Sequence, residues 1–180
     1  MCILLSSLAL IGTVQAQGNK KILIAYFSWG GNTREIAKQI QKQTDGDLFE
    51  ITASSPYSAS YDECVKQAKK EQQDNARPQF TGEVKNMENY DVVFVGYPNW
   101  WGTMPMVLFT FLEKYDMSNK TIIPFCTHGS GRWGRSIDDL KKLLPNSTVL
   151  EGCAIAGNTV RNSKDEVAKW LQKTGTANKK

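Results

Sequence analysis

The apolar positions follow two patterns along the chain: short continuous runs, and longer stretches in which apolar residues recur with helical spacing and form stripes. The runs predict strands at residues 22–27, 48–51, 91–97 and 121–126, and one interrupted strand at 148–150 and 153–156. The stripes predict helices at 33–43, 61–75 and 104–115, one with Ile137, Leu140 and Leu144, and a terminal one with Val167, Trp170 and Leu171. Because strands and helices alternate five times, we expect an α/β fold: a parallel sheet with helices on both faces.

Two Ser-x-x-Glu motifs mark the predicted starts of two helices. Ser60 precedes Glu63, and Ser163 precedes Glu166. At this spacing the serine hydroxyl and the glutamate carboxylate hydrogen-bond to free amides of the first helical turn. The motifs therefore predict capping boxes at both positions.

The first predicted strand leads into a turn rich in hydroxyl groups and glycine. This first loop consists of Ser28, Trp29, Gly30, Gly31, Asn32 and Thr33. The free amides and the positive dipole end of the following helix face such a turn and favour anion binding. The glycines allow close approach, and the side chains of Ser28, Asn32 and Thr33 can bond to phosphate oxygens. Because the turn contains no lysine, it differs from the loop of nucleoside triphosphatases. An ordinary strand-to-helix turn is the structural alternative.

Two more unusual loops follow later strands. The second loop consists of Pro98, Asn99, Trp100, Trp101 and Gly102, and the third loop (residues 127–134) begins with Thr127, His128, Gly129, Ser130 and Gly131. Since the carboxyl ends of parallel strands share one edge of a sheet, the three loops can meet around one ligand. A phosphate-binding turn beside tryptophans that stack on flat rings favours an aromatic ligand with a phosphate tail. The alternatives are tryptophans packed in the core and a structural histidine.

Residues 22–40, 92–102 and 121–134 resemble the flavodoxin-like family, and the resemblance extends over essentially the whole chain after residue 19. The first loop matches the family's Ser/Thr-x-Thr-Gly-x-Thr phosphate loop at Ser28, Gly31 and Thr33. The resemblance implies a three-layer, doubly wound fold with a five-stranded parallel sheet in the order 2-1-3-4-5. It also implies FMN as the cofactor, with the phosphate on the first loop and the flavin ring between the second and third loops.

The sequence departs from that family in two respects. Gly30 replaces a threonine of the phosphate loop, which removes one hydroxyl bond worth about 1 kcal/mol. The net charge is +4 and the pI is about 8.8, whereas flavodoxin electron carriers resemble one another in being acidic. The basic residues lie on helical faces among acidic neighbours, so we interpret them as solvated surface and expect no nucleic-acid partner.

By resemblance, the function is electron or hydride transfer through FMN, to a redox partner protein or a small-molecule acceptor. Backbone amides of residues 99–102 and 127–129 are candidate donors to the ring. As an enzyme the protein would be an oxidoreductase of the NAD(P)H:quinone type, with no catalytic side chain predicted. One alternative is NAD(P) binding, because residues 129–134 match Gly-x-Gly-x-x-Gly and Glu151 ends the next strand. The other is a non-catalytic exported module that has lost its cofactor.

The N-terminal residues differ from the rest of the chain. Residues 1–19 carry no charged side chain, and an apolar run at 3–14 leads to Val14-Gln15-Ala16, which resembles a secretory cleavage site. The run is shorter than the ~20 apolar residues that span a bilayer, and no Lys or Arg precedes it. We expect a signal peptide at 1–17, a domain at 20–175 and export, to the periplasm, without a membrane anchor after cleavage. If the segment is not a functional signal, the expected location is the cytoplasm. The oligomeric state stays open, a dimer included.

The four cysteines are Cys2, Cys64, Cys126 and Cys153, with no Cys-x-x-Cys motif. Cleavage at 17 would leave three, an odd number that does not suit a disulfide framework. Cys64 shares a helical stripe with Tyr61, Val65 and Ala68, and the other two lie in predicted strands. We interpret all three as buried structural thiols.

Overall fold

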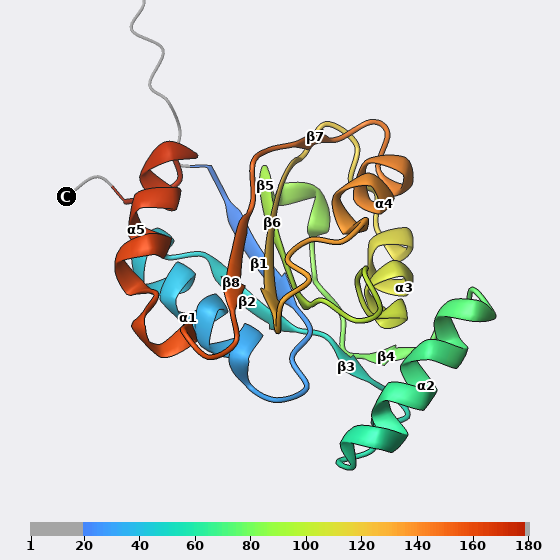
Figure 1. Cartoon of the computed structure of the whole chain (residues 1–180). Coiled ribbons are helices and arrows are strands. Elements are labelled where there is room, and N and C mark those ends of the chain that lie inside the picture. The colour runs from blue at the N-terminus through green and yellow to red at the C-terminus, as the bar shows by residue number, and fades with distance from the viewer. Residues whose placement is uncertain (1–19, 179–180) are drawn as a thin grey trace, which may run out of the picture.

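The structure, a computed structural model, describes residues 20–178, so the predicted signal peptide lies outside the described residues. Its centre is a parallel sheet in the order β2-β1-β5-β6, completed at one edge by β7 and β8 (Figure 1). The strands are β1 (Ile22–Tyr26), β2 (Asp47–Glu50), β5 (Val92–Pro98), β6 (Thr121–His128), β7 (Thr148–Val149) and β8 (Cys153–Ala156). When β7 and β8 are counted as one interrupted strand, this is the predicted order 2-1-3-4-5.

The interruption between β7 and β8 has a local cause in β6. Both short strands pair with β6 in parallel, β7 at Thr121 and β8 from Phe125 onward. Pro124 lies between these positions and has no N–H to donate to that edge. Gly152 passes close to it, and a Cβ on Gly152 would lie 2.4 Å from the Pro124 carbonyl oxygen. The chain therefore bends away at residues 150–152 and rejoins the sheet at β8.

Helices cover both faces of this sheet (Figure 1). On one face, α1 (Asn32–Thr44) and α5 (Lys164–Lys173) bury Ile36 and Leu171 against Phe94. On the other, α3 (Met106–Lys114) and α4 (Ser136–Leu143) bury Phe111 and Leu140 against the sheet. Two short 3-10 helices, η1 (Met87–Asn89) and η2 (Val160–Asn162), precede β5 and α5. The predicted three-layer α/β architecture is confirmed.

The connection between β2 and β5 contains the predicted helix and, in addition, two short strands that the pattern did not predict. Two-residue strands β3 (Thr52–Ala53) and β4 (Phe80–Thr81) pair in antiparallel fashion at its base. Between them, α2 (Tyr61–Gln73) projects from the body of the molecule (Figure 1). Within α2 only Cys64 and Ala68 are buried. This helix therefore stands beside the three-layer core instead of covering the sheet.

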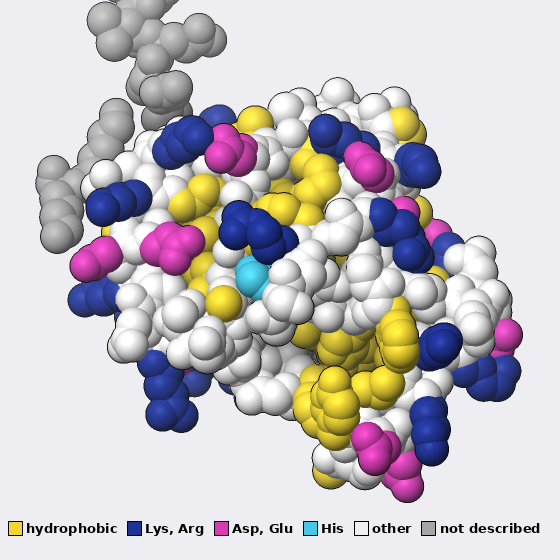
Figure 2. Space-filling view, in the orientation of Figure 1, with side chains coloured by type: hydrophobic (Ala, Val, Ile, Leu, Met, Phe, Trp, Pro, Cys, Tyr) yellow, Lys and Arg dark blue, Asp and Glu magenta, His cyan; other side chains and the backbone are white. Residues whose placement is uncertain are grey.

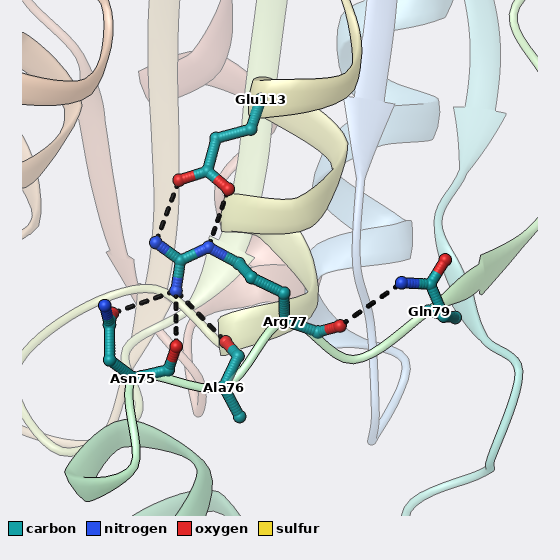
Figure 3. A network of polar contacts seen from close by, with 5 residues as sticks. All are labelled: Asn75, Ala76, Arg77, Gln79 and Glu113. Atoms are coloured by element: carbon teal, nitrogen blue, oxygen red, sulfur yellow. Dashed lines mark hydrogen bonds and ion pairs between the residues drawn. The ribbon is translucent and has the colours of Figure 1, made fainter.

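Arg77 attaches the chain after α2 to α3 (Figure 3). Its Nε and Nη2 donate to the Glu113 carboxylate at 2.6 and 2.8 Å, and Nη1 donates to the carbonyl oxygens of Asn75 and Ala76. The guanidinium also lies 5.4 Å from the centre of the Phe109 ring. Because the ion pair is partly exposed, it contributes about 1 kcal/mol or less, but its forked geometry fixes the end of α2.

The helices α2 and α5 begin close to the predicted positions, but the capping boxes do not form. Ser60 and Ser163 make no side-chain cap bond. The Glu63 carboxylate instead accepts from the hydroxyl of Ser58, and the Ser163 hydroxyl donates to the Val160 carbonyl. The side chains of Glu63 and Ser163 therefore bond within local turns and not to the free amides at the starts of the helices. None of the helices in residues 20–178 has the length and apolar character needed to cross a membrane.

Candidate functional site

The first loop presents six consecutive backbone amides, those of residues 28–33, that have no acceptor within residues 20–178. The first helical bond is made one turn later, from the Glu35 amide to the Gly31 carbonyl at 3.0 Å. Gly31 has φ of 90°, a conformation that favours glycine. A Cβ on Gly30 or Gly31 would meet no atom within 4 Å, so the space before these amides is open. The head of α1 is therefore a ready anion-binding site.

Hydroxyl groups brace the first loop. The Ser28 hydroxyl accepts a bond from the Arg34 amide at 3.2 Å. The Thr33 hydroxyl lies 2.9 Å from that of Thr127, and both residues are buried. In each of these two contacts, one hydroxyl group keeps a proton that it can donate to a ligand. The structure thus ties the first loop to the end of β6 and leaves the backbone amides as the main donors available to an anion.

The cation nearest this loop in the chain is neutralised by a carboxylate. Arg34 donates to Glu50 through Nε at 2.9 Å and Nη2 at 2.5 Å, and the Tyr26 hydroxyl donates to the same carboxylate at 3.1 Å. Burial, with the charge of Glu50, raises the pKa of Tyr26 to about 12. The amides and the dipole of α1 thus provide the attraction for an anion, as expected from a turn without lysine.

The second loop is a tight two-residue turn with an unusual occupant. Trp100 and Thr103 exchange amide-to-carbonyl bonds at 2.9 and 3.1 Å across the turn. Trp101 and Gly102 between them have φ of 52° and 79°, the left-handed geometry of a type I′ turn. A bulky residue in this conformation costs about 1–3 kcal/mol. In this strained turn the Trp101 side chain is 46% exposed at the carboxyl edge of the sheet.

The two tryptophans both point toward α2, but in different environments. Trp100 packs edge to face on Phe27 and Tyr57, with ring centres 5.3 and 5.0 Å apart, at the border of the core. The indole N–H of Trp101 donates to the Val65 carbonyl in α2 at 3.1 Å. Trp100 thus packs at the border of the core, whereas Trp101 stays partly exposed, and both line the same cavity.

Asn99 joins the second loop to the third. Its Oδ1 accepts from the Gly102 amide at 3.0 Å, and its Nδ2 donates to the Arg132 carbonyl at 2.7 Å. The Arg135 amide donates to the Gly102 carbonyl at 2.7 Å, and a Cβ on Gly134 would lie 2.2 Å from that carbonyl oxygen. The amides of Asn99, Trp100 and Gly102 are therefore used inside the fold, which leaves the Trp101 amide as the donor of the second loop.

The third loop offers unpaired groups at the same edge. β6 extends two residues beyond its predicted end, so Thr127 and His128 close the strand. Both ring nitrogens of His128 are buried without a partner in the described part of the chain, and the amides of Gly129, Ser130 and Gly131 likewise lack acceptors there. Figure 2 shows the histidine, in cyan, at the molecular surface. A buried ring nitrogen without a partner costs about 1–3 kcal/mol, so the two nitrogens of His128, together with the exposed amides of residues 129–131, fit a ligand rich in carbonyl and ring nitrogen atoms.

The alternative dinucleotide site does not have the required geometry. The amides of Gly134 and Ser136 donate to Gly131 and Trp133 within the same turn, while the Arg135 amide is used by Gly102. The carboxylate of Glu151, the acidic residue that accompanied the glycine motif in this alternative, pairs with Lys173 at 2.6 Å. The first turn of α4 is therefore closed to a pyrophosphate.

A cavity of about 270 Å³ adjoins the first two loops on the side of α2. It is lined by Trp29, Tyr61, Cys64, Val65, Ala68, Asn99, Trp100 and Trp101. Four of these residues were predicted as site residues, and the four on α2 were missed because their stripe was interpreted as a core face. Tyr61, 68% exposed, contradicts that interpretation. The sequence held one sign of this difference: the apolar stripe of α2 is too narrow to anchor a helix in the core.

The described cysteines are buried and free, as expected for structural thiols: Cys64, Cys126 and Cys153. Burial raises the pKa of Cys126 and that of Cys153 to about 12, so neither is a nucleophile at neutral pH.

Comparisons with known proteins agree with this geometry. A family model described as Flavodoxin matches residues 21–174. A candidate flavoprotein of Bacteroides eggerthii is 33% identical over 86% of this chain and 98% of its own, with a TM-score of 0.77. One of Bacteroides uniformis is 29% identical over 86% and 99%, also with a TM-score of 0.77. A Lactobacillus acidophilus flavoprotein, solved in complex with FMN, shares the fold at 22% identity over 83% and 99%, with a TM-score of 0.67. No curated protein sequence matches the chain. From the sheet order, the open first loop and the family model, the chain belongs to the flavodoxin family.

Proposed function

We propose that this chain binds FMN at the carboxyl edge of its sheet and passes electrons, singly or as hydride, between the cofactor and a redox partner. The observation that carries the proposal is the run of six unpaired amides at the head of α1. Membership of the flavodoxin family and the FMN complex of the Lactobacillus relative support the same cofactor. The partner is a protein or a small-molecule acceptor, and export through the predicted signal at 1–17 would place the reaction in the periplasm.

Each loop has a separate task in this proposal. The amides of the first loop hold the phosphate, with the dipole of α1 in place of a cationic side chain. The free amides of the third loop and the orphan nitrogens of His128 offer hydrogen bonds to polar atoms of the ring. Asn99 keeps the second and third loops at a constant separation. When bound, the flavin itself supplies the redox chemistry.

The phosphate site is tested by comparing FMN with riboflavin, which lacks the phosphate. Asn32 is exposed in the first turn of α1, and Asn32→Asp places a negative charge beside the free amides. An acidic residue in this turn stabilises a helix by about 0.3–1 kcal/mol, so loss of binding cannot be attributed to unfolding. We expect Asn32→Asp to weaken FMN binding by about tenfold or more, equal to about 1.4 kcal/mol, and to leave riboflavin binding nearly unchanged.

The measurement is a fluorescence titration of the apoprotein with each flavin. Asn89→Asp is the matched control, because Asn89 lies in η1 at the opposite edge of the sheet. An equal loss of FMN and riboflavin affinity, or no loss of either, would show that the phosphate lies elsewhere. Purified protein that takes up no flavin at all would favour the module without a cofactor.

A further inference from the structure

We infer that Glu50 sets the affinity of the first loop for a phosphate group, because it holds Arg34 in an ion pair and cancels the charge of that cation beside the anion site. Glu50 ends β2 and lies directly beside Tyr26, the last residue of β1, in the register of the parallel pair. The inference rests on the proposed function, since it takes the anion to be the phosphate of FMN. It assigns a role to a residue outside the three loops.

Arg34 is attached to the first loop through its backbone. Its amide donates to the Ser28 hydroxyl at 3.2 Å, and it directly follows Thr33, which carries the last of the six free amides. One turn of helix rises about 5.4 Å, so the Arg34 side chain starts within a turn of an anion bound to these amides. A cation in the first turn opposes the positive end of the helix dipole. An arginine here is therefore unfavourable unless an anion compensates it.

Glu50 provides that compensation within the protein. The guanidinium of Arg34 donates to this carboxylate through Nε at 2.9 Å and Nη2 at 2.5 Å, and the Tyr26 hydroxyl donates to it at 3.1 Å. Among residues 20–178, Glu50 is the acidic side chain that pairs with Arg34. The three bonds fix the carboxylate and orient the guanidinium toward β2. A phosphate at the head of α1 thus competes with Glu50 for the charge of Arg34.

The ion pair is exposed enough to be broken without loss of the fold. The side chain of Arg34 is 42% exposed and that of Glu50 is 31% exposed. Exposed pairs contribute little to stability, so removal of the carboxylate should free the cation and leave the sheet intact. The chain contains a matched pair on α3: Arg77 and Glu113 have the same forked geometry and side chains 31% and 38% exposed (Figure 3). That pair provides the control.

Substitutions at the two positions give a graded series of charge beside the first loop. Glu50→Gln keeps an oxygen for the Tyr26 hydroxyl but leaves Arg34 without its carboxylate, and we expect FMN to bind about fivefold more tightly or better. Arg34→Gln leaves the charge of Glu50 uncompensated and should weaken FMN binding by about fivefold or more. The double variant restores the net charge, so its affinity should lie within about twofold of the parent.

Fluorescence titrations of the apoprotein with FMN and with riboflavin measure the series. Riboflavin carries no phosphate, so its affinity should change by less than about twofold in every variant. The gain in Glu50→Gln should shrink in about 1 M salt, where the Debye length falls to about 3 Å. Glu113→Gln releases Arg77 instead and should alter FMN binding by less than about twofold. A change in riboflavin affinity equal to that of FMN would indicate a distorted loop and would overturn the inference.

The outcomes separate this inference from the proposed function. If the parent binds FMN but Glu50→Gln binds it no more tightly, the inference is wrong and the proposed function stands. A double variant that binds FMN as tightly as Glu50→Gln would show that Arg34 is not the cation involved, which also overturns the inference.

A parent that binds no flavin would refute the proposed function, and inorganic phosphate then tests the inference by itself. Because a bound ligand stabilises the folded state, phosphate should raise the unfolding temperature of Glu50→Gln more than that of the parent. Equal shifts in the two proteins would contradict a role of Glu50 in anion affinity.

Discussion

At the scale of single residues, a pair of threonines far apart in the chain determines how the first loop meets the sheet. Thr33 and Thr127 are separated by 94 residues, and their hydroxyl oxygens lie 2.9 Å apart in a buried contact. The sequence analysis predicted Thr33 as a phosphate-binding residue of the first loop and Thr127 as a ring-binding residue of the third loop. Their mutual bond could not be inferred from spacing, since it depends on the packing of α1 against β6.

Valine substitutions test that pair. Thr33→Val or Thr127→Val leaves the other hydroxyl buried without a partner, at a cost of about 1–3 kcal/mol in the free energy of unfolding. The double variant removes both hydroxyls and should lose clearly less than the sum of the two single losses, with a coupling of about 1 kcal/mol. Urea unfolding of the apoprotein gives all four values. Additive losses would mean that the two hydroxyls do not bond in solution.

At the scale of elements, the second and third loops behave as one unit. Asn99 bridges them with its side chain, and Gly134 packs directly on the carbonyl of Gly102. The glycine-rich motif at 129–134 therefore has a packing role in place of the dinucleotide role that its pattern allowed. A glycine motif indicates where the backbone can approach another group closely. The tertiary structure decides whether that group is a ligand or another segment of the chain.

A pair of glycine variants tests this packing. Gly134 has φ of 52°, and a Cβ there would collide with the Gly102 carbonyl, so Gly134→Ala must separate the loops. We expect a loss of at least about 2 kcal/mol in the free energy of unfolding, typical of strain combined with overpacking. Gly129→Ala is the control, because no atom lies within 4 Å of the added Cβ. Similar stabilities of the two variants in urea would contradict the close approach.

At the scale of the whole molecule, buried tyrosines connect the sheet to its surroundings and limit stability in alkali. Tyr97 is fully buried and donates to the Ser136 hydroxyl at 2.9 Å, and burial raises its pKa above the ordinary value. Tyr90 donates to Asp47 at 2.7 Å, and burial with this bond raises the pKa of Tyr90 to about 12. The pKa of Tyr26 is raised to about 12 by burial and Glu50. All three phenols are therefore held in their neutral form by the fold.

This arrangement predicts unfolding in alkali. Because the folded-state pKa values exceed the value of about 10 in the unfolded chain, the stabilisation is complete below pH 10 and is lost as the pH rises toward 12. Tyrosinate absorbance and far-ultraviolet circular dichroism, recorded on one pH series, should change together in that interval. Ionisation of these tyrosines near pH 10 with an unchanged dichroism spectrum would disprove the burial-driven shift.

The sequence by itself determined the features that depend on neighbours along the chain. The apolar run at β1, the glycines after it and the stripe of α1 predicted a strand, an open turn and a helix, and therefore an anion-binding site. Alternation of such units predicted a parallel sheet with helices on both faces. The strand order 2-1-3-4-5 and the cofactor were implied by the family resemblance.

Only the tertiary structure decided which groups remain free. The position of α2, the bonds from the Trp29 and Trp101 indoles to its backbone, and the pairing of Thr33 with Thr127 join segments far apart in the chain. A stripe with one exposed tyrosine looks the same in sequence whether it faces a core or a cavity. The physical reason is that a local pattern records the apolar character of a face, whereas its partner is selected by the packing of the complete molecule.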